Sequence, residues 1–163
     1  MLLGTHVSIA GGYLNSLIEA KRLGIDAIQI FTKNQRFWQE KLVSEEEGDA
    51  FKNPLPKYGV QQAFSHAIYL ISLGSENEDI VQKSLLSLVA EMERCRVLGL
   101  THTVLHPGFA GKGTPKEAIR RILVTYKNGY PGNKRKPGKN PPGEHCRARF
   151  KYWWKDRIHR RND

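Results

Sequence analysis

The sequence is poor in cysteine, since its 163 residues contain only Cys95 and Cys146. Two cysteines so far apart form neither a disulfide framework nor the Cys-x-x-Cys knuckle of a zinc finger. No run approaches the ~20 apolar residues of a membrane span, and the first residues lack the basic start of a signal peptide. These absences argue against secreted and membrane-spanning classes, so we expect a soluble, cytoplasmic protein.

Acidic residues are also scarce. The sequence contains 16 Asp and Glu but 26 Lys and Arg, which gives a net charge of +10. Twelve of the 26 basic residues lie in residues 126–163, which contain one Ile, Leu, Val or Met, namely Ile158. The first 125 residues are close to neutral. The basic character therefore belongs to the end of the chain and says little about the partners of the rest.

Short apolar runs alternate with helical patterns over the first 124 residues. The runs cover residues 3–8, 26–31, 60–66 and 101–106, and helical stripes cover residues 15–23 and 76–98 and begin again at 115. Ser44 and Glu47 form a capping box that begins a further helix, which Pro54 and Pro56 interrupt. Such alternation predicts an α/β fold of TIM-barrel type with parallel strands, truncated to about four βα units.

The alternation of strands and helices stops near residue 124, which predicts two domains. Residues 1–124 are predicted to form a partial (β/α) barrel, and residues 125–163 a disordered basic tail in which no period of 2 or 3.6 can be built. The composition changes inside a helical pattern, whereas natural boundaries fall in linkers. We interpret the tail as non-native, as a shifted reading frame would produce; the alternative is a genuine extension that binds nucleic acid.

His66 and His106 each stand at the end of an apolar run. The carboxyl ends of barrel strands meet on one face, where α/β barrels assemble metal sites, and neutral imidazole suits zinc. His6 ends the first run and is a possible neighbour of the site. A zinc site needs at least a third ligand, and none is predicted here. Glu144, in the basic part of the chain, has no strand around it and is not accepted as that ligand. The sequence therefore predicts no complete catalytic set.

Four segments in this order resemble endonuclease IV, the zinc-dependent apurinic/apyrimidinic endonuclease of base-excision repair and a member of AP endonuclease family 2. They are GTHVSIAGG at residues 4–12, IFTKNQRFW at 30–38, HAIYLISLG at 66–74 and LHPG at 105–108. Each motif alone is weak, but four in order at successive strand ends are specific. The resemblance covers residues 1–124 and only the N-terminal half of the family.

The resemblance implies a TIM barrel with three zinc ions that hydrolyses the phosphodiester 5′ to abasic sites in double-stranded DNA. It implies that His66 and His106 bind one zinc ion. The family's later strands supply a Glu and further His, Asp and Glu ligands, which have no counterpart in this chain. We therefore expect at most a partial zinc site, a truncated and inactive chain, and no protein partner.

The resemblance also implies residues that contact DNA. A planar cation, an aromatic ring and an apolar wedge can replace the stacking lost where a base is missing, and polar side chains can donate to phosphates. An alternative is that Tyr69 and Leu70 are core residues beneath a loop and Arg36 a solvated side chain. The wedge residues are Arg36, Tyr69 and Leu70, and the phosphate donors are Lys33, Asn34 and Gln35.

Two other functions remain open. The chain could be a non-catalytic DNA-binding fragment that uses Arg36, Tyr69 and the basic tail, with binding that depends steeply on salt. It could also be a fragment of a sugar-isomerase-like barrel, whose strands likewise end in His and carboxylates. The segment from Phe31 to Arg36 argues against the second alternative, because those barrels need no loop that penetrates DNA.

Overall fold

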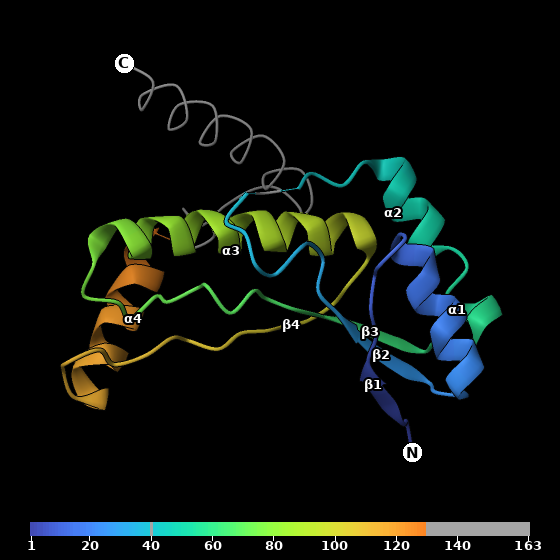
Figure 1. Cartoon of the computed structure of the whole chain (residues 1–163), viewed down its shortest axis with the longest axis horizontal. Coiled ribbons are helices and arrows are strands. Elements are labelled where there is room, and N and C mark those ends of the chain that lie inside the picture. The colour runs from blue at the N-terminus through green and yellow to red at the C-terminus, as the bar shows by residue number, and fades with distance from the viewer. Residues whose placement is uncertain (40, 130–163) are drawn as a thin grey trace, which may run out of the picture.

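The computed structural model describes residues 1–39 and 41–129 (Figure 1). Within them, strands and helices alternate along the chain, as predicted. The tail from residue 130 onward, with Glu144 and Cys146, lies outside the described residues. The elements are β1 (Gly4–His6), α1 (Tyr13–Leu23), β2 (Ala27–Ile30), α2 (Glu45–Lys52), the 3-10 helix η1 (Pro56–Tyr58), β3 (Gln62–His66), α3 (Glu78–Leu98), β4 (Thr103–Val104) and α4 (Pro115–Gly129).

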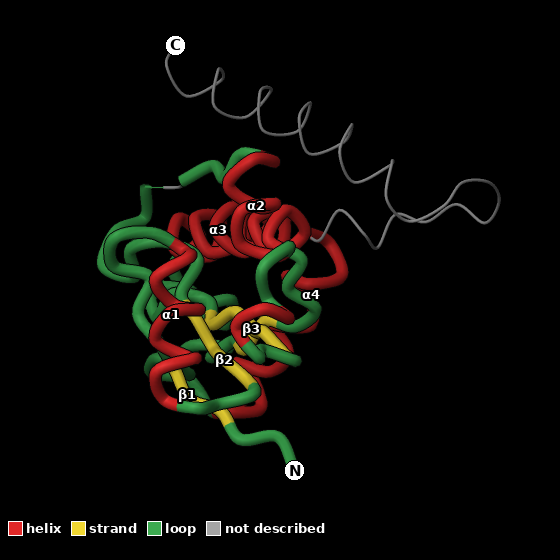
Figure 2. Tube along the Cα trace, turned by 90° about the vertical axis from the view of Figure 1, so that its right-hand side faces the viewer, coloured by secondary structure: helices red, strands yellow, loops and turns green. Residues whose placement is uncertain are grey.

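The four strands form one parallel sheet in the order β1-β2-β3-β4. This arrangement confirms the α/β fold of barrel-type units, and it leaves β1 and β4 as the edge strands of the described sheet. In both Figure 1 and Figure 2, α3 runs across above the strands. The register places His6 beside Gln29 and His66 beside Val104, so the carboxyl ends of the strands come together.

The helix-facing side of the sheet carries the main core. Leu17 of α1, Ile30 of β2, Phe51 of α2 and Leu98 of α3 are all 0% exposed and belong to one apolar cluster. Helix α2 lies so close to the end of α3 that a Cβ on Gly48 would collide with the carbonyl oxygen of Val97. A side chain at this position would therefore push the two helices apart.

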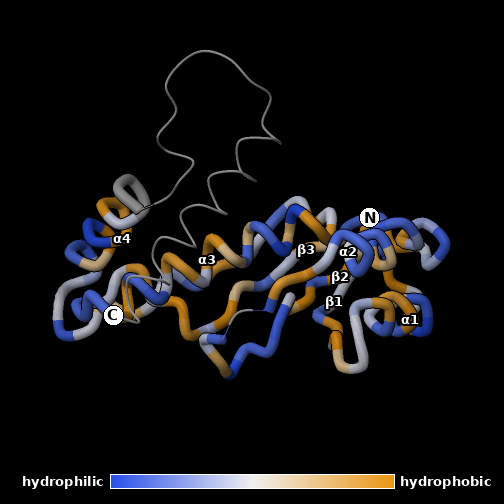
Figure 3. Tube along the Cα trace, turned by 90° about the horizontal axis from the view of Figure 1, so that it is seen from above, coloured by the Kyte–Doolittle hydropathy of each residue, from blue (hydrophilic) through white to orange (hydrophobic). Residues whose placement is uncertain are grey.

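A second apolar cluster supports the loop that follows β3. Ile68, Ile71 and Leu73 of this loop pack with residues of α3, including Leu85 and Leu88. Figure 3 shows hydrophobic stretches along α3, with α4 at the opposite end of this helix from α1 and α2. The loop after His66 is thus a packed part of the structure.

The helix ends follow the sequence-based expectations, with two differences in length. Ser44 accepts from the Glu47 amide, and Glu47 accepts from the Ser44 amide, which confirms the predicted capping box. Strand β4 is shorter than expected, because it pairs with β3 at only two positions. Helix α4 extends to Gly129, past residue 124. None of the helices in residues 1–39 and 41–129 is long and apolar enough to cross a membrane.

The capping box makes stability depend on pH. Hydrogen bonds from Lys41 and from the Ser44 amide hold the pKa of the Glu47 carboxyl below its ordinary value of 4.5. Because the folded pKa lies below the unfolded one, the carboxylate stabilises the fold above pH 4.5, and this stabilisation is lost as the pH falls through the folded pKa. Glu47→Gln should lower the free energy of unfolding at neutral pH by up to about 1 kcal/mol.

Urea denaturation of both proteins at about pH 7 and about pH 3 tests this prediction. The difference between the two proteins should shrink at the lower pH, because the Glu47 carboxylate takes up protons as the pH falls and its stabilising charge is progressively lost. An equal difference at the two pH values would show that the charge of Glu47 has no such role.

Candidate functional site

Three histidines gather at the carboxyl ends of the strands. His66 ends β3, His106 follows β4, and His6 ends β1. The ring centroids of His66 and His106 lie 5.2 Å apart, and those of His6 and His66 lie 6.2 Å apart. The structure therefore brings together the histidines that the sequence singled out, although His6 and His66 are separated by sixty residues of chain.

The hydrogen bonding of His66 suits a metal ligand. The side chain is buried, and its Nδ1 lies 2.6 Å from the carbonyl oxygen of Ala67. A carbonyl oxygen only accepts, so Nδ1 carries a proton, and in the neutral imidazole Nε2 is then the nitrogen with the lone pair, the arrangement that orients metal-binding imidazoles. With Zn–N distances of about 2 Å, two imidazoles on a tetrahedral zinc have centroids about 5 Å apart. The 5.2 Å between the His66 and His106 centroids is compatible with this spacing.

Further ligands do not join this pair within the described part of the chain. Residues 1–39 and 41–129 contain no group of three or more His, Cys, Asp and Glu side chains that could hold a metal. Protein zinc sites use three or four ligands. Within these residues, the histidine pair alone supplies fewer side chains than a protein zinc site uses.

Aromatic rings surround the histidines. The Phe31 centroid lies 4.6 Å from that of His6 and 5.1 Å from that of His66. Tyr69 lies 5.0 Å from His66 and 5.2 Å from His106, yet it remains 59% exposed. Tyr69 therefore lines the histidine cluster and faces solvent, whereas Leu70 is half-buried and packs against the second apolar cluster. Sequence analysis did not place Phe31 in this site, although its position directly after β2 indicates it.

The segment from Asn34 to Trp38, here called the recognition loop, follows β2 at the same end of the sheet. Asn34, Gln35 and Arg36 are exposed, and the Asn34 side chain accepts a hydrogen bond of 2.9 Å from the Arg36 amide, which turns the chain. Phe37 is 58% exposed, a feature that sequence analysis missed. The loop thus exposes a guanidinium and, at the next residue in sequence, an aromatic ring.

Lys33 requires a correction. The sequence predicted a phosphate donor, but the side chain is 4% exposed, and its Nζ donates to the carbonyl oxygens of Phe37 at 2.6 Å and Gln39 at 3.1 Å. An ammonium group enclosed in this way is turned toward the protein and away from a phosphate on the surface. Its two hydrogen bonds connect the residue before the recognition loop to the far end of that loop.

A buried polar network lies beneath this loop. The exposed fractions of Thr32, Glu91 and Arg94 are only 1%, 1% and 2%. An Arg94 Nη2 to Glu91 Oε2 contact of 2.7 Å joins the charges, and the Thr32 hydroxyl accepts from Arg94 Nε at 2.8 Å and donates to Glu91 at 2.5 Å. The network fixes the start of the loop to α3. On the sequence, Glu91 and Arg94 are indistinguishable from an exposed ion pair.

Two other buried groups extend the connection between the helices and the strand ends. The Tyr13 hydroxyl of α1 donates to the Thr32 carbonyl oxygen at 2.6 Å, and burial raises the pKa of Tyr13 to about 12. Cys95 of α3 lies 3.1 Å from the Ser65 hydroxyl, and burial raises the pKa of its thiol. Both groups remain uncharged at neutral pH and serve as structural links.

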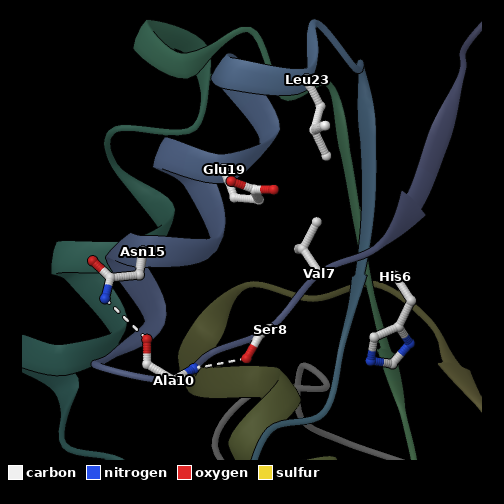
Figure 4. A pocket seen from close by; sticks show the side chains of 7 residues that line it. All are labelled: His6, Val7, Ser8, Ala10, Asn15, Glu19 and Leu23. Carbon is white, nitrogen blue, oxygen red and sulfur yellow. Dashed lines mark hydrogen bonds between the residues drawn. The ribbon is translucent and has the colours of Figure 1, made fainter.

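A hollow of about 320 Å³ lies beside the histidine cluster, between β1 and α1 (Figure 4). Its polar groups hold the intervening turn, because Asn15 Nδ2 donates to the Ala10 carbonyl oxygen and the Ala10 amide donates to Ser8. The hollow lies at the edge strand of the described sheet, because its lining comes from the end of β1, the turn that follows it, and α1. The lining residues are His6, Val7, Ser8, Ala10, Asn15, Glu19 and Leu23.

The buried ion pair should dominate local stability. Arg94→Met leaves the Glu91 carboxylate buried without its cation, which typically costs about 3–5 kcal/mol of unfolding free energy. Arg22→Met is a matched control, because Arg22 pairs with Glu19 at the same i,i+3 spacing but on the surface. Denaturant titration should show a much smaller loss for the control than for Arg94→Met, because solvent screens the exposed Arg22–Glu19 pair.

Replacing both partners checks the explanation. The double variant Glu91→Leu/Arg94→Met removes both charges and should recover a large part of the stability that Arg94→Met loses. An Arg94→Met protein as stable as the Arg22→Met control would contradict a structural role for the buried pair.

Comparisons with known proteins agree with this architecture. The family model described as xylose isomerase-like TIM barrel matches residues 17–126. A probable endonuclease 4 of Geobacter sp. (strain M21) is 41% identical over 125 residues, which cover 77% of this chain and 44% of the relative. The crystal structure of endonuclease IV from Thermus thermophilus matches with a TM-score of 0.67 and 35% identity, over 79% of this chain and 47% of the other.

A more distant structure shares the fold alone. D-psicose 3-epimerase, crystallised in the presence of D-fructose, matches with a TM-score of 0.56 at 10% identity, over 78% of this chain and 47% of the other. The chain spans less than half the length of each of these three proteins.

Proposed function

Because the chain belongs to the xylose isomerase-like TIM barrel family and its described part is endonuclease IV-like, we propose that its strand-end face recognises abasic sites in double-stranded DNA. One observation carries the proposal. The paired histidines His66 and His106, with Tyr69 against both rings, stand at the same end of the sheet as the exposed Arg36.

Duplex DNA that lacks a base suits this face. The missing base leaves a gap in the stack, which lowers the cost of distorting the duplex and extruding the nucleotide. The Arg36 guanidinium and the exposed Tyr69 ring can enter such a gap, and Asn34 and Gln35 can donate to the flanking phosphates. Leu70 is half-buried and packs against the second apolar cluster, so we expect it to enter the gap less than Arg36 and Tyr69 do.

Zinc fits the histidine pair as a partial site. His66 would bind through Nε2, which its Nδ1 bond to the Ala67 carbonyl oxygen leaves available, and His106 would supply the second imidazole. Bound zinc supplies Lewis-acid stabilisation of the phosphate and a hydroxide near neutral pH. The family's glutamate and further ligands have no counterpart in this sequence, so we propose that this chain binds damaged DNA without hydrolysing it.

Fluorescence anisotropy with two matched duplexes tests recognition. One duplex carries a tetrahydrofuran abasic analogue, and the other has an intact base at that position. The chain should prefer the abasic duplex, and Arg36→Ala or Tyr69→Ala should reduce this preference by about tenfold each, as stacking side chains contribute about 1–3 kcal/mol. Lys57→Ala, on the exposed 3-10 helix η1, is the control and should keep the preference. Equal affinity for both duplexes would contradict the proposal.

The basic tail favours a second function, binding to DNA of any structure. Residues 126–163 carry twelve Lys and Arg, enough for many phosphate contacts. This alternative predicts equal affinity for both duplexes, and a slope of log affinity against log salt of about −0.9 for each phosphate contacted. Deleting residues 130–163 should abolish such binding, whereas recognition by Arg36 and Tyr69 should survive the deletion.

A further inference from the structure

We propose that Thr32, Lys33, Glu91 and Arg94 are positioning residues for DNA binding. Together they form a bracket beneath the recognition loop Asn34–Trp38 and hold Arg36 in the orientation that meets the duplex. The inference rests on the proposed function, and it assigns a role to four buried residues that do not touch DNA themselves.

The first part of the bracket closes the loop upon itself. The Lys33 ammonium lies just before the loop and donates to the carbonyl oxygens of Phe37 and Gln39 at its far end. These bonds connect the two ends of the loop through one buried cation that is 4% exposed. A buried ammonium must satisfy its donors, so this closure is hard to release.

The second part fixes the closed loop to α3. Arg94 binds the Thr32 hydroxyl through Nε at 2.8 Å and the Lys41 carbonyl oxygen through Nη1 at 3.3 Å. Thr32 precedes the recognition loop and Lys41 follows it, so one guanidinium holds both flanks. Glu91 orients this guanidinium through the 2.7 Å contact with Nη2.

The bracket also decides which side chains face solvent. The Phe37 carbonyl oxygen is turned inward to Lys33, the Phe37 ring is 58% exposed, and the preceding residue, Arg36, is also exposed. The next residue, Trp38, is half-buried and packs against the second apolar cluster. The loop is therefore anchored on both sides of its exposed apex, and a loop ordered before binding loses less conformational entropy when DNA arrives.

Thr32 offers a matched pair of substitutions. Thr32→Val has nearly the same shape but lacks the hydroxyl that joins Glu91 and Arg94, whereas Thr32→Ser keeps it. We expect Thr32→Val to accelerate amide hydrogen exchange in residues 33–39 and to weaken binding of the tetrahydrofuran duplex by about tenfold. Thr32→Ser should restore both properties toward those of the unsubstituted chain.

A double-mutant cycle separates positioning from general loss of stability. If Thr32 acts by positioning Arg36, Thr32→Val should reduce DNA affinity in the unsubstituted chain. In a chain that already carries Arg36→Ala, the same substitution should reduce DNA affinity little further. Losses that simply add would overturn the inference. Lys33→Met keeps the aliphatic stem and removes the ammonium, so it provides a second variant, with the same expected coupling to Arg36, should Thr32→Val fail to fold.

The two readouts distinguish the inference from the function on which it rests. An unsubstituted chain with no preference for the abasic duplex would contradict the proposed function, and the positioning role with it. A chain that prefers the abasic duplex, with exchange in residues 33–39 and DNA affinity both unchanged by Thr32→Val, would overturn the inference alone.

Discussion

The buried ion pair between Glu91 and Arg94 is the constraint on which the strand-end face depends. Two charges at this depth are stable only when they satisfy each other and their neighbours, and here Thr32 supplies the neighbouring hydroxyl. Arg94 also donates to the Thr32 hydroxyl and the Lys41 carbonyl oxygen, so these bonds join α3 to both flanks of the recognition loop. The same helix supports the loop after His66 through Leu85 and Leu88. A single helix therefore aligns the loop that presents Arg36 with the loop that presents Tyr69.

The parallel sheet explains why the histidines meet. Each strand enters from the same side, so the residues that end β1 and β3 arrive at one edge together with His106 after β4. Four βα units are sufficient to bring these rings together and to place aromatic side chains around them. The described residues contain no group of three or more His, Cys, Asp and Glu side chains that could hold a metal, and the chain spans less than half of the length of its relatives.

Much of the fold could be predicted because its determinants are local. The spacing of apolar residues predicted α3, Gly99 with its positive φ ends that helix, and Ser44 and Glu47 cap α2 as their order in the sequence indicated. The place of His66 and His106 at strand ends was also predictable, because parallel strands share one carboxyl edge.

The burial of charged residues could not be predicted in the same way. Lys33 stands beside Asn34 and Gln35 on the sequence, and nothing local distinguishes the buried donor from the exposed ones. Glu91 and Arg94 have the spacing of a surface pair, and only the packing of α3 beneath the loop encloses them. These long-range contacts decide which polar residues are enclosed in the site and which of them face solvent.

Nitrogen NMR of the imidazole rings during a zinc titration tests the central claim most directly. If His66 and His106 are two ligands of one site, their Nε2 resonances should shift together with one zinc per chain, while the Nδ1 proton of His66 remains bound to the Ala67 carbonyl oxygen. His102, which bonds Thr101, should not change. Zinc that leaves both His66 and His106 unshifted would contradict the proposal that these two histidines bind zinc together.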